Sequence, residues 1–272
     1  MTRVPIRGKA WLEEHAGKRT VVKIYPHGDT ARFKCWGSGA GNERIARLLL
    51  GKHVPRTFLV WTDRQADYAE LEWLSGSPLR TDVATALDVL TAGEMLGRIH
   101  SHRSNWWGSL DGVYRFSDPH TALQSRFALA VTLLSDRDAW LAERVENWAV
   151  TLMNNVELTG PPVLVHGDFG PTNLIRSGDG QSVLDWEHAR WGDAVEDWAK
   201  LRFAAKFPEP NGFGDGEEVL ELLETGWTRV TGDPVPRNRS LESLLEVYFA
   251  ISLGVFFGGN NPRMDWLRER FG

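Results

Sequence analysis

The sequence predicts an α+β protein, with a small, mainly β N-terminal part that holds one helix and a larger, mainly helical C-terminal part. Two patterns support this prediction. Short apolar runs of strand length alternate with turns from residue 9 to residue 73, and beyond Pro78 most apolar residues recur at helical spacing. The turn-rich stretch Ser75-Gly76-Ser77-Pro78 separates the two patterns. We therefore expect one structural unit over residues 1–76 and a second over residues 77–272.

The N-terminal part is expected to be a β-β-α-β-β unit. Asn42 is the expected N-cap of a helix over Glu43–Leu50, which Gly51 and Pro55 end. The Gly-rich stretch at 37–41 lacks the ending of a phosphate-binding P-loop, so we expect a flexible connector there. The strands are expected at Lys9–Glu14, Thr20–Tyr25, Arg56–Trp61 and Tyr68–Trp73.

The C-terminal part is expected to be helical except in its middle. Two short apolar runs, Val163–Val165 and Ser182–Leu184, have β character and flank a polar loop. We expect the chemistry of the protein in this loop. The helices are expected at Val83–His100, Thr121–Asn155, Val195–Phe207, Glu217–Val230 and Leu241–Phe257.

Composition excludes several classes of protein. The 272 residues are 42% hydrophobic and 25% charged, as in globular proteins, and the net charge of −5 argues against nucleic acid as a partner. The single Cys35 cannot form an internal disulfide, which favours a reducing, cytoplasmic location. The most apolar stretch, Val247–Phe257, is shorter than the ~18–20 residues that cross a bilayer, so no membrane partner is expected.

The polar loop carries oxygen-bearing side chains at a suggestive spacing. Asp168 and Asn173 lie five residues apart, and Asp185 follows the second β-type run. One carboxylate and one amide oxygen make a partial site for Mg²⁺, which keeps water and phosphate ligands as well, and the other carboxylate can then accept a proton. The alternative is a polar turn that joins two strands, because His-Gly-Asp alone is common.

The motif H-G-D-x-x-x-x-N at residues 166–173, followed by Asp185-Trp186-Glu187, resembles the catalytic and metal-binding loops of the aminoglycoside phosphotransferase family, relatives of protein kinases. The chain lacks an A-P-E element and has no room for an activation loop, which indicates a small-molecule kinase. The resemblance implies a protein-kinase-like two-lobed fold, ATP with GTP as the alternative, and Mg²⁺. It makes Asp168 the catalytic residue and Asn173 and Asp185 the metal ligands.

The resemblance also implies a nucleotide site. Lys23 resembles the ATP lysine of the family and Glu43 its ion-pair partner, whereas Glu72, Trp73 and Leu74 resemble the hinge whose backbone meets adenine. The alternatives are an edge-strand lysine and a first-turn glutamate favoured by the helix dipole. The first strand and phosphate-covering loop of the family would precede Lys9, so we expect that strand to be very short or missing.

Asp193 and Asp197 resemble residues that hold the catalytic loop in this family. His166 is expected to support the loop by hydrogen bonding, with a direct catalytic role as the alternative. His100, at the end of the preceding helical segment, is expected only to pack.

The acceptor is the least determined part of the reaction. Glu187 and His188 are candidates to contact it because they lie next to Asp185. Trp106 and Trp107 are candidates because flat indoles suit a sugar ring, although large aromatic side chains more often fill a core. The stretch 207–224 is rich in Asp and Glu without Lys or Arg, which would attract a polycation or form a solvated helix face.

We therefore expect an ATP-dependent O-phosphotransferase that acts on a small hydroxylated molecule. The favoured acceptor is an aminoglycoside or similar antibiotic, which would make the protein a resistance enzyme. The alternatives are a kinase of an ordinary metabolite such as an amino sugar, and a nucleotide-binding pseudokinase. The sequence leaves the choice between a monomer and a homodimer open.

Overall fold

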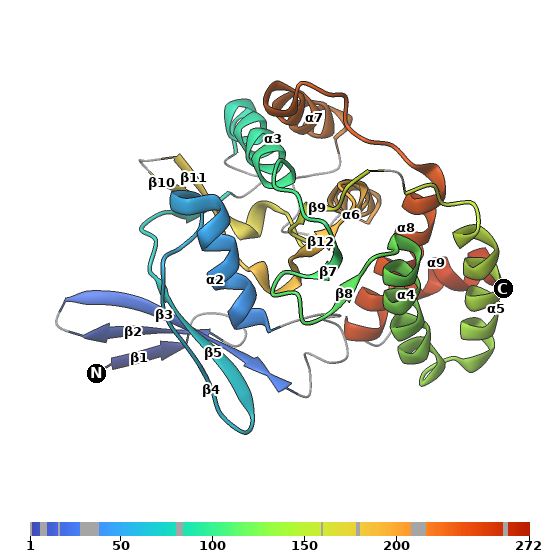
Figure 1. Ribbon diagram of the computed structural model, residues 1–272, viewed down its shortest axis with the longest axis horizontal. Coiled ribbons are helices and arrows are strands. Elements are labelled where there is room, and N and C mark those ends of the chain that lie inside the picture. The colour runs from blue at the N-terminus through green and yellow to red at the C-terminus, as the bar shows by residue number, and fades with distance from the viewer. Residues whose placement is uncertain are drawn as a thin grey trace.

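The computed structural model describes residues 2–5, 10–15, 17–27, 38–79, 84–158, 160–177, 180–207, 216–257 and 261–272. An N-terminal antiparallel sheet lies at one end of the molecule and most helices lie at the other (Figure 1). The strand order of the sheet is β1-β2-β3-β5-β4. Its strands are β1 (Thr2–Pro5), β2 (Ala10–His15), β3 (Lys18–Pro26), β4 (Thr57–Thr62) and β5 (Ala66–Glu72).

The first strand is present and short: β1 has four residues and pairs with β2. The residues between β1 and β2, where a phosphate-covering loop was sought, lie outside the described part of the chain.

Helix α2 (Gly39–Leu50) packs on this sheet and begins earlier than expected. Ser38 is its N-cap, because the Ser38 side chain accepts a hydrogen bond from the Gly41 N–H at 3.2 Å. The predictions of an Asn42 cap and of a flexible connector over 39–41 were therefore wrong. Gly39 lies so close to the Tyr25 ring that a Cβ atom would clash with it, which explains a glycine in the first helical turn.

Seven helices are described in the C-terminal part. The expected single helix over 121–155 was wrong, because Asp138 caps a new helix by accepting a hydrogen bond from the Leu141 N–H at 3.1 Å. The last helix was not predicted, although Asn261 before Pro262 is a recognisable start signal. The helices are α3 (Ala86–His100), α4 (Pro119–Ser135), α5 (Ala139–Met153), α6 (Val195–Lys206), α7 (Glu217–Thr231), α8 (Arg239–Phe257) and α9 (Pro262–Phe271).

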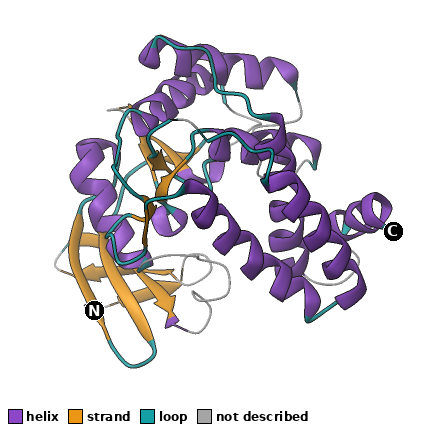
Figure 2. Cartoon of the chain, turned by 45° about the vertical axis from the view of Figure 1, so that its right-hand side comes forward, coloured by secondary structure: helices purple, strands orange, loops and turns teal. Residues whose placement is uncertain are grey.

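Short strands surrounded by helices carry the polar loop (Figure 2). One sheet has the order β8-β7-β12-β9 and another the order β11-β10-β6. Short helices η1 (Gly51–His53), η2 (Pro171–Asn173) and η3 (Trp186–His188) complete the connections. The strands are β6 (Ser77–Pro78), β7 (Trp107–Ser109), β8 (Arg115–Phe116), β9 (Val163–Val165), β10 (Leu174–Ser177), β11 (Gly180–Val183) and β12 (Arg190–Gly192).

Two hydrophobic cores hold the helices. The first joins residues of α4, α5, α6, α8 and α9. The second runs from Ala46 and Leu50 of α2 to Leu96 of α3, Leu164 of β9 and Trp186 of η3. Because α2 shares this second core, its N-terminal residues are held next to the loops of the C-terminal part. None of the helices in the described ranges is long and apolar enough to cross a bilayer.

Candidate active site

Three charged side chains from distant parts of the sequence meet between α2 and the C-terminal part. Lys23 Nζ of β3 lies 2.7 Å from Glu43 Oε1 of α2 and 2.9 Å from Asp185 Oδ1, which follows β11. The Tyr25 hydroxyl donates a second hydrogen bond to Glu43 Oε1 at 3.0 Å. Because Glu43 is only 1% exposed, its charge is directed at Lys23 with little screening by water.

The pKa values show how strongly these groups depend on one another. Burial lowers the pKa of Lys23, but the charges of Glu43 and Asp185 outweigh it and hold that pKa well above its ordinary value. Burial raises the pKa of Asp185, but the charge and hydrogen bond of Lys23 outweigh it and lower that pKa to about 2. Lys23 and Asp185 therefore both carry their charges at neutral pH.

The backbone at Asp185 aims this carboxylate. Among the described residues, Asp185 is the only non-glycine residue with positive φ (φ 64°, ψ 62°). Residues that carry a Cβ atom rarely adopt this backbone conformation. The turn leads from β11 into η3, which lies against α2. There the Asn42 amide donates a hydrogen bond to the Ala189 carbonyl at 3.0 Å. Asn42 thus joins the two parts of the molecule instead of capping a helix.

Asp168 and Asn173 lie together in the loop between β9 and β10. The Asn173 amide nitrogen donates to the Asp168 carbonyl at 2.9 Å and to Asp168 Oδ2 at 3.2 Å. The Leu184 N–H donates to the Asn173 carbonyl at 2.7 Å, so Asn173 lies beside the residue that precedes Asp185. The Asp168 side chain is 43% exposed and is therefore open to a substrate.

Asn173 and Asp185 form a donor set that suits Mg²⁺. The Asn173 amide nitrogen points at Asp168, so its amide oxygen points away from that carboxylate. One amide oxygen and one carboxylate match a magnesium ion that keeps water and phosphate oxygens in its shell. Within the described residues no cluster of three or more His, Cys, Asp or Glu side chains could hold a metal ion, so an ion here would depend on those additional oxygens.

A buried aspartate holds the loop after β9 in shape. Asp197 of α6 accepts hydrogen bonds from the His166 N–H at 2.9 Å and the Gly167 N–H at 2.7 Å, and it lies 3.1 Å from His100 Nε2. Trp227 Nε1 donates to His100 Nδ1 at 3.0 Å, which orients the ring. The prediction that His100 only packs was wrong, because it links α3 to the aspartate that holds the loop.

His166 supports the loop from inside. Its Nε2 lies 2.9 Å from the Leu184 carbonyl, and its Nδ1 accepts from the Asp168 N–H at 3.2 Å. The next residue, Gly167, has φ +82°, and a Cβ atom there would lie 2.6 Å from an Arg190 nitrogen and from the His188 carbonyl. Only glycine therefore fits between the two loops without strain.

This geometry agrees with what comparison with known proteins shows. A family model described as the phosphotransferase enzyme family (APH) matches residues 9–232. The chain belongs to the aminoglycoside phosphotransferase family. A search of curated protein sequences gives no match for this phosphotransferase.

Solved structures share the protein-kinase-like fold of this phosphotransferase. A candidate fructosamine-3-kinase from Thermobifida fusca YX-ER1 has a TM-score of 0.68 at 19% identity, covering 98% of this chain and 90% of its own. A thermostable mutant of aminoglycoside phosphotransferase APH(4)-Ia, in a ternary complex with ADP and hygromycin B, has a TM-score of 0.65 at 14% identity and covers 99% and 90%. An aminoglycoside-3'-phosphotransferase of type VIII has a TM-score of 0.62 at 17% identity and covers 91% and 93%. At these identities the likeness shows the fold.

The expected hinge of the phosphotransferase follows β5. Glu72 ends this strand, its N–H donates to the Arg56 carbonyl at 2.8 Å, and its carboxylate accepts from the Arg56 N–H at 3.0 Å. Trp73 and Leu74 follow as partly buried residues. The Glu72 side chain thus braces the segment, whereas a contact with adenine would involve backbone groups.

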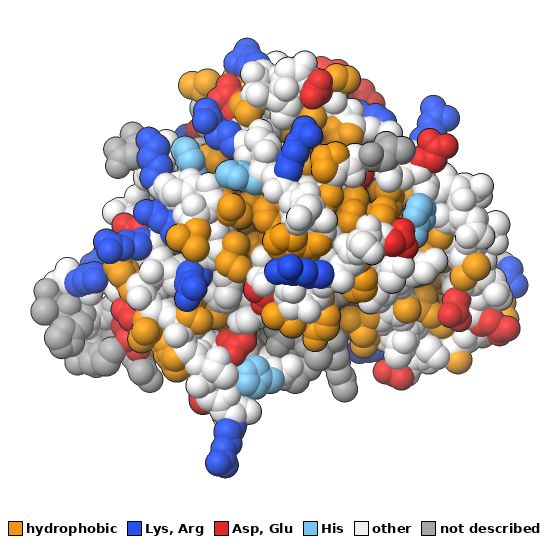
Figure 3. Space-filling model, in the orientation of Figure 1, with side chains coloured by type: hydrophobic (Ala, Val, Ile, Leu, Met, Phe, Trp, Pro, Cys, Tyr) orange, Lys and Arg blue, Asp and Glu red, His pale blue; other side chains and the backbone are white. Residues whose placement is uncertain are grey.

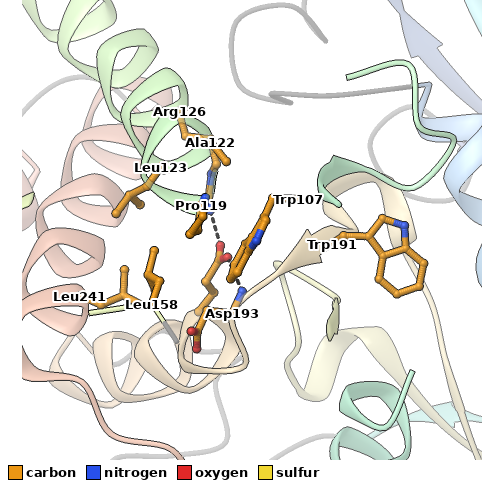
Figure 4. A pocket seen from close by; sticks show the side chains of 10 residues that line it. Trp107, Pro119, Ala122, Leu123, Arg126, Leu158, Trp191, Asp193 and Leu241 are labelled. Carbon is orange, nitrogen blue, oxygen red and sulfur yellow. Dashed lines mark hydrogen bonds and ion pairs between the residues drawn. The ribbon is translucent and has the colours of Figure 1, made fainter. Parts of the chain in front are cut away.

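A second buried ion-pair cluster starts α6. Asp193 accepts from the Val195 N–H at 2.8 Å, and burial raises the Asp193 pKa. Glu196 pairs with Arg126 and with Arg190, whose Nε lies 2.9 Å away. Arg126, Asp193 and Glu196 line a cavity of about 20 Å³, and Figure 4 shows its lining side chains. The cluster fixes α6 behind the catalytic loop and does not reach Asp168.

The four residues named as candidates to contact the acceptor fall into two groups. Trp107 is 8% exposed and lines the small cavity beside Asp193 (Figure 4). Trp106 packs against the second core, and its Nε1 donates to the Ser109 carbonyl at 3.1 Å. His188 Nε2 and Glu187 Oε1 lie 3.5 Å apart in η3, and both side chains remain partly exposed shortly after Asp185, with Trp186 between. Their position therefore favours them over the indoles.

One residue close to Asp168 was missed by the sequence analysis. Lys200 Nζ of α6 lies 3.5 Å from Asp168 Oδ1. The only signal in the sequence is that Lys200 lies three residues after Asp197, on neighbouring positions of one helix face.

Proposed function

We propose that this phosphotransferase transfers the γ-phosphate of ATP to a hydroxyl group of a small molecule. The observation that carries the proposal is the meeting of Lys23, Glu43 and Asp185 beside the Asn173–Asp168 pair. A phosphate-binding cation, oxygen ligands for a metal and an exposed carboxylate are the parts that phosphoryl transfer requires.

Each residue has a distinct role in this proposal. Lys23, held by Glu43, binds the α- and β-phosphates, and the backbone of Glu72, Trp73 and Leu74 binds adenine. Asn173 and Asp185 hold Mg²⁺, which when bound neutralises charge on the phosphates.

Asp168 accepts the proton of the acceptor hydroxyl and orients its oxygen. Because the transferred group needs little covalent assistance, positioning and charge account for most of the rate.

The acceptor class is proposed from relatives and from position. Solved relatives include an enzyme complexed with hygromycin B, which supports an aminoglycoside or similar antibiotic and with it a role in resistance. The acidic stretch 207–224 does not support a polycationic acceptor. Its described glutamates lie on α7, which packs on α3. Glu224 is already paired with Arg237 at 2.7 Å and with Arg202 at 3.5 Å. Glu209 and Asp215 lie outside the described residues. On the face of the molecule drawn in Figure 3, the acidic side chains of the described residues are scattered and form no continuous patch.

A second candidate acceptor is an amino sugar. The candidate fructosamine-3-kinase among the solved relatives supports a metabolic kinase as well as a resistance enzyme. Both acceptors present a hydroxyl of a sugar-like ring, so the same placement of Asp168 serves either reaction.

The proposal is tested by measuring ATP consumption with Mg²⁺ against aminoglycosides, other hydroxylated antibiotics, amino sugars and small alcohols. Turnover on one acceptor that is lost in Asp168→Ala supports the proposal and separates resistance from metabolism. Nucleotide binding without turnover on any acceptor would instead support a pseudokinase. The absence of any ATP binding would contradict both.

A further inference from the structure

Lys200 lies beside Asp168, the carboxylate that accepts the acceptor proton in the proposed reaction. It lies on α6 one turn after Asp197, the residue that fixes the backbone of the catalytic loop. Its ammonium group is 3.5 Å from Asp168 Oδ1, whereas Asp168 Oδ2 accepts from Asn173 at 3.2 Å. The two oxygens of the catalytic carboxylate therefore face two different donors.

The surroundings of Lys200 hold the ammonium close to the loop. Its side chain is 16% exposed, and Nζ lies 5.3 Å from the centre of the Phe249 ring of α8. A cation over an aromatic face is attracted to it, and the four-carbon stem still lets the ammonium turn toward a new partner. The 3.5 Å separation from Asp168 is long for a hydrogen bond, so this contact is easily exchanged.

The other basic residues near these loops are already committed. Lys23 pairs with Glu43 and Asp185, and Arg190 pairs with Glu196. The segment between Asp168 and Asn173 contains no Lys or Arg. Among the described residues, Lys200 is therefore the cation beside Asp168, and its 3.5 Å approach to that carboxylate is its shortest ion pair.

We propose that Lys200 is a further catalytic residue of this phosphotransferase, whose ammonium binds an oxygen of the phosphoryl group during transfer. The inference rests on the proposed function. In the reaction, the acceptor oxygen forms a bond to the γ-phosphorus and its proton goes to Asp168. The bond from the γ-phosphorus to the bridging oxygen breaks, and its electron pair leaves with ADP.

The charge of Lys200 acts on this step directly. An acceptor oxygen hydrogen-bonded to Asp168 brings the phosphoryl oxygens close to the ammonium, which can then leave the Asp168 carboxylate. A preorganised cation at developing charge stabilises the transition state more than the ground state. Lys200 therefore acts on the transferred group, whereas Lys23 binds the phosphates that remain on the nucleotide.

The test compares Lys200→Met and Lys200→Gln with Lys206→Met. Lys206 is a matched control, because it lies on the same helix, 4.6 Å over the Trp266 ring, and pairs with Glu246 at 3.5 Å. Binding of Mg²⁺ with ADP, and of Mg²⁺ with ADP and aluminium fluoride, is measured by calorimetry. Aluminium fluoride takes the place of the transferred phosphoryl group. The KM for ATP and kcat are measured with an active acceptor.

Wild type and Lys206→Met should bind ADP more tightly when aluminium fluoride is present. Both Lys200 variants should bind ADP as wild type does but lose this tightening, and their kcat should fall roughly 10- to 100-fold with an unchanged KM for ATP. Lys200→Arg should recover part of the rate because it keeps the charge.

Lys200 variants that still bind ADP more tightly with aluminium fluoride, and that keep the wild-type kcat, would overturn the inference about Lys200 but not the proposed function. Unchanged ADP binding would show that these variants are folded. A Lys200→Met kcat that falls together with loss of ADP binding in both variants would assign a structural role and would also overturn it. A wild type that neither binds Mg²⁺ with ATP nor transfers phosphate would overturn the proposed function, and the inference with it.

Discussion

Replacement of Asp197 by alanine tests how the catalytic loop is held. Asp197 is fully buried and serves the His166 N–H, the Gly167 N–H and His100 Nε2. Each buried donor left without a partner costs about 1–3 kcal/mol. Because three donors lose their partner, we expect Asp197→Ala to lower the free energy of unfolding by at least about 3 kcal/mol, a large part of the ~5–15 kcal/mol that holds a domain together.

The assay is urea unfolding of wild type and variant, followed by tryptophan fluorescence. Asp118→Ala is the matched control, because Asp118 also accepts from two backbone N–H groups, of His120 and Thr121, but at an exposed helix start. The control should lose only about 1 kcal/mol. Equal losses in the two variants would refute the argument that burial makes the Asp197 contacts expensive to break.

The pH dependence of stability gives an independent test of Asp197. Burial raises its pKa, but the hydrogen bond and charge of His100 outweigh burial and hold the Asp197 pKa below its ordinary value. A carboxylate with a depressed folded-state pKa stabilises the fold above its unfolded pKa, about 3.9, and this contribution is lost as pH falls through the folded value. Wild type should therefore lose more stability than Asp197→Ala as pH falls from about 5 through the folded-state pKa of Asp197. Identical acid dependence would contradict the assignment.

Three further outcomes are expected. Asp168→Ala should nearly abolish turnover while retaining nucleotide binding, whereas Asp185→Ala should remove Mg²⁺-dependent nucleotide binding, as measured by calorimetry; the reverse pattern would exchange the two roles. Glu43→Gln should raise the KM for ATP by roughly tenfold with a smaller change in kcat, because Lys23 loses a charged partner at 2.7 Å; steady-state kinetics showing an unchanged KM would contradict this. Gly167→Ala should lower the free energy of unfolding by about 1–3 kcal/mol in urea unfolding, because φ is +82° and the new Cβ would press on the neighbouring loop; a neutral result would show that the loop yields without cost.

Local sequence determined the chemistry of the catalytic loop. Asp168 and Asn173 are joined by a short loop, and the Asn173 amide reaches the Asp168 carboxylate across it, so their spacing alone predicts that they meet. Asn173 precedes β10 and Asp185 follows β11, and these two strands pair as a hairpin. The hairpin brings Asn173 beside Leu184, the residue before Asp185. The alternating strands and the helix before Leu50 likewise follow from local patterns of apolar and turn residues.

Local signals failed where a helix start or break depends on one side chain. Ser38 and Asp138 begin helices with single capping hydrogen bonds, and the apolar periodicity on either side of Asp138 continues almost without interruption. Such periodicity predicts that a segment is helical but does not show that it consists of two helices.

Only the tertiary structure decided which distant residues serve the loop. Asn42 reaches the Ala189 carbonyl because α2 packs into the second core, and His100 of α3 reaches Asp197 of α6 because both helices contribute to that same core. Lys200 reaches Asp168 because α6 packs on α8 with Phe249 beneath its ammonium. Helical periodicity gives the direction of a side chain relative to its own helix axis, but the packing of helices against each other sets where that face points.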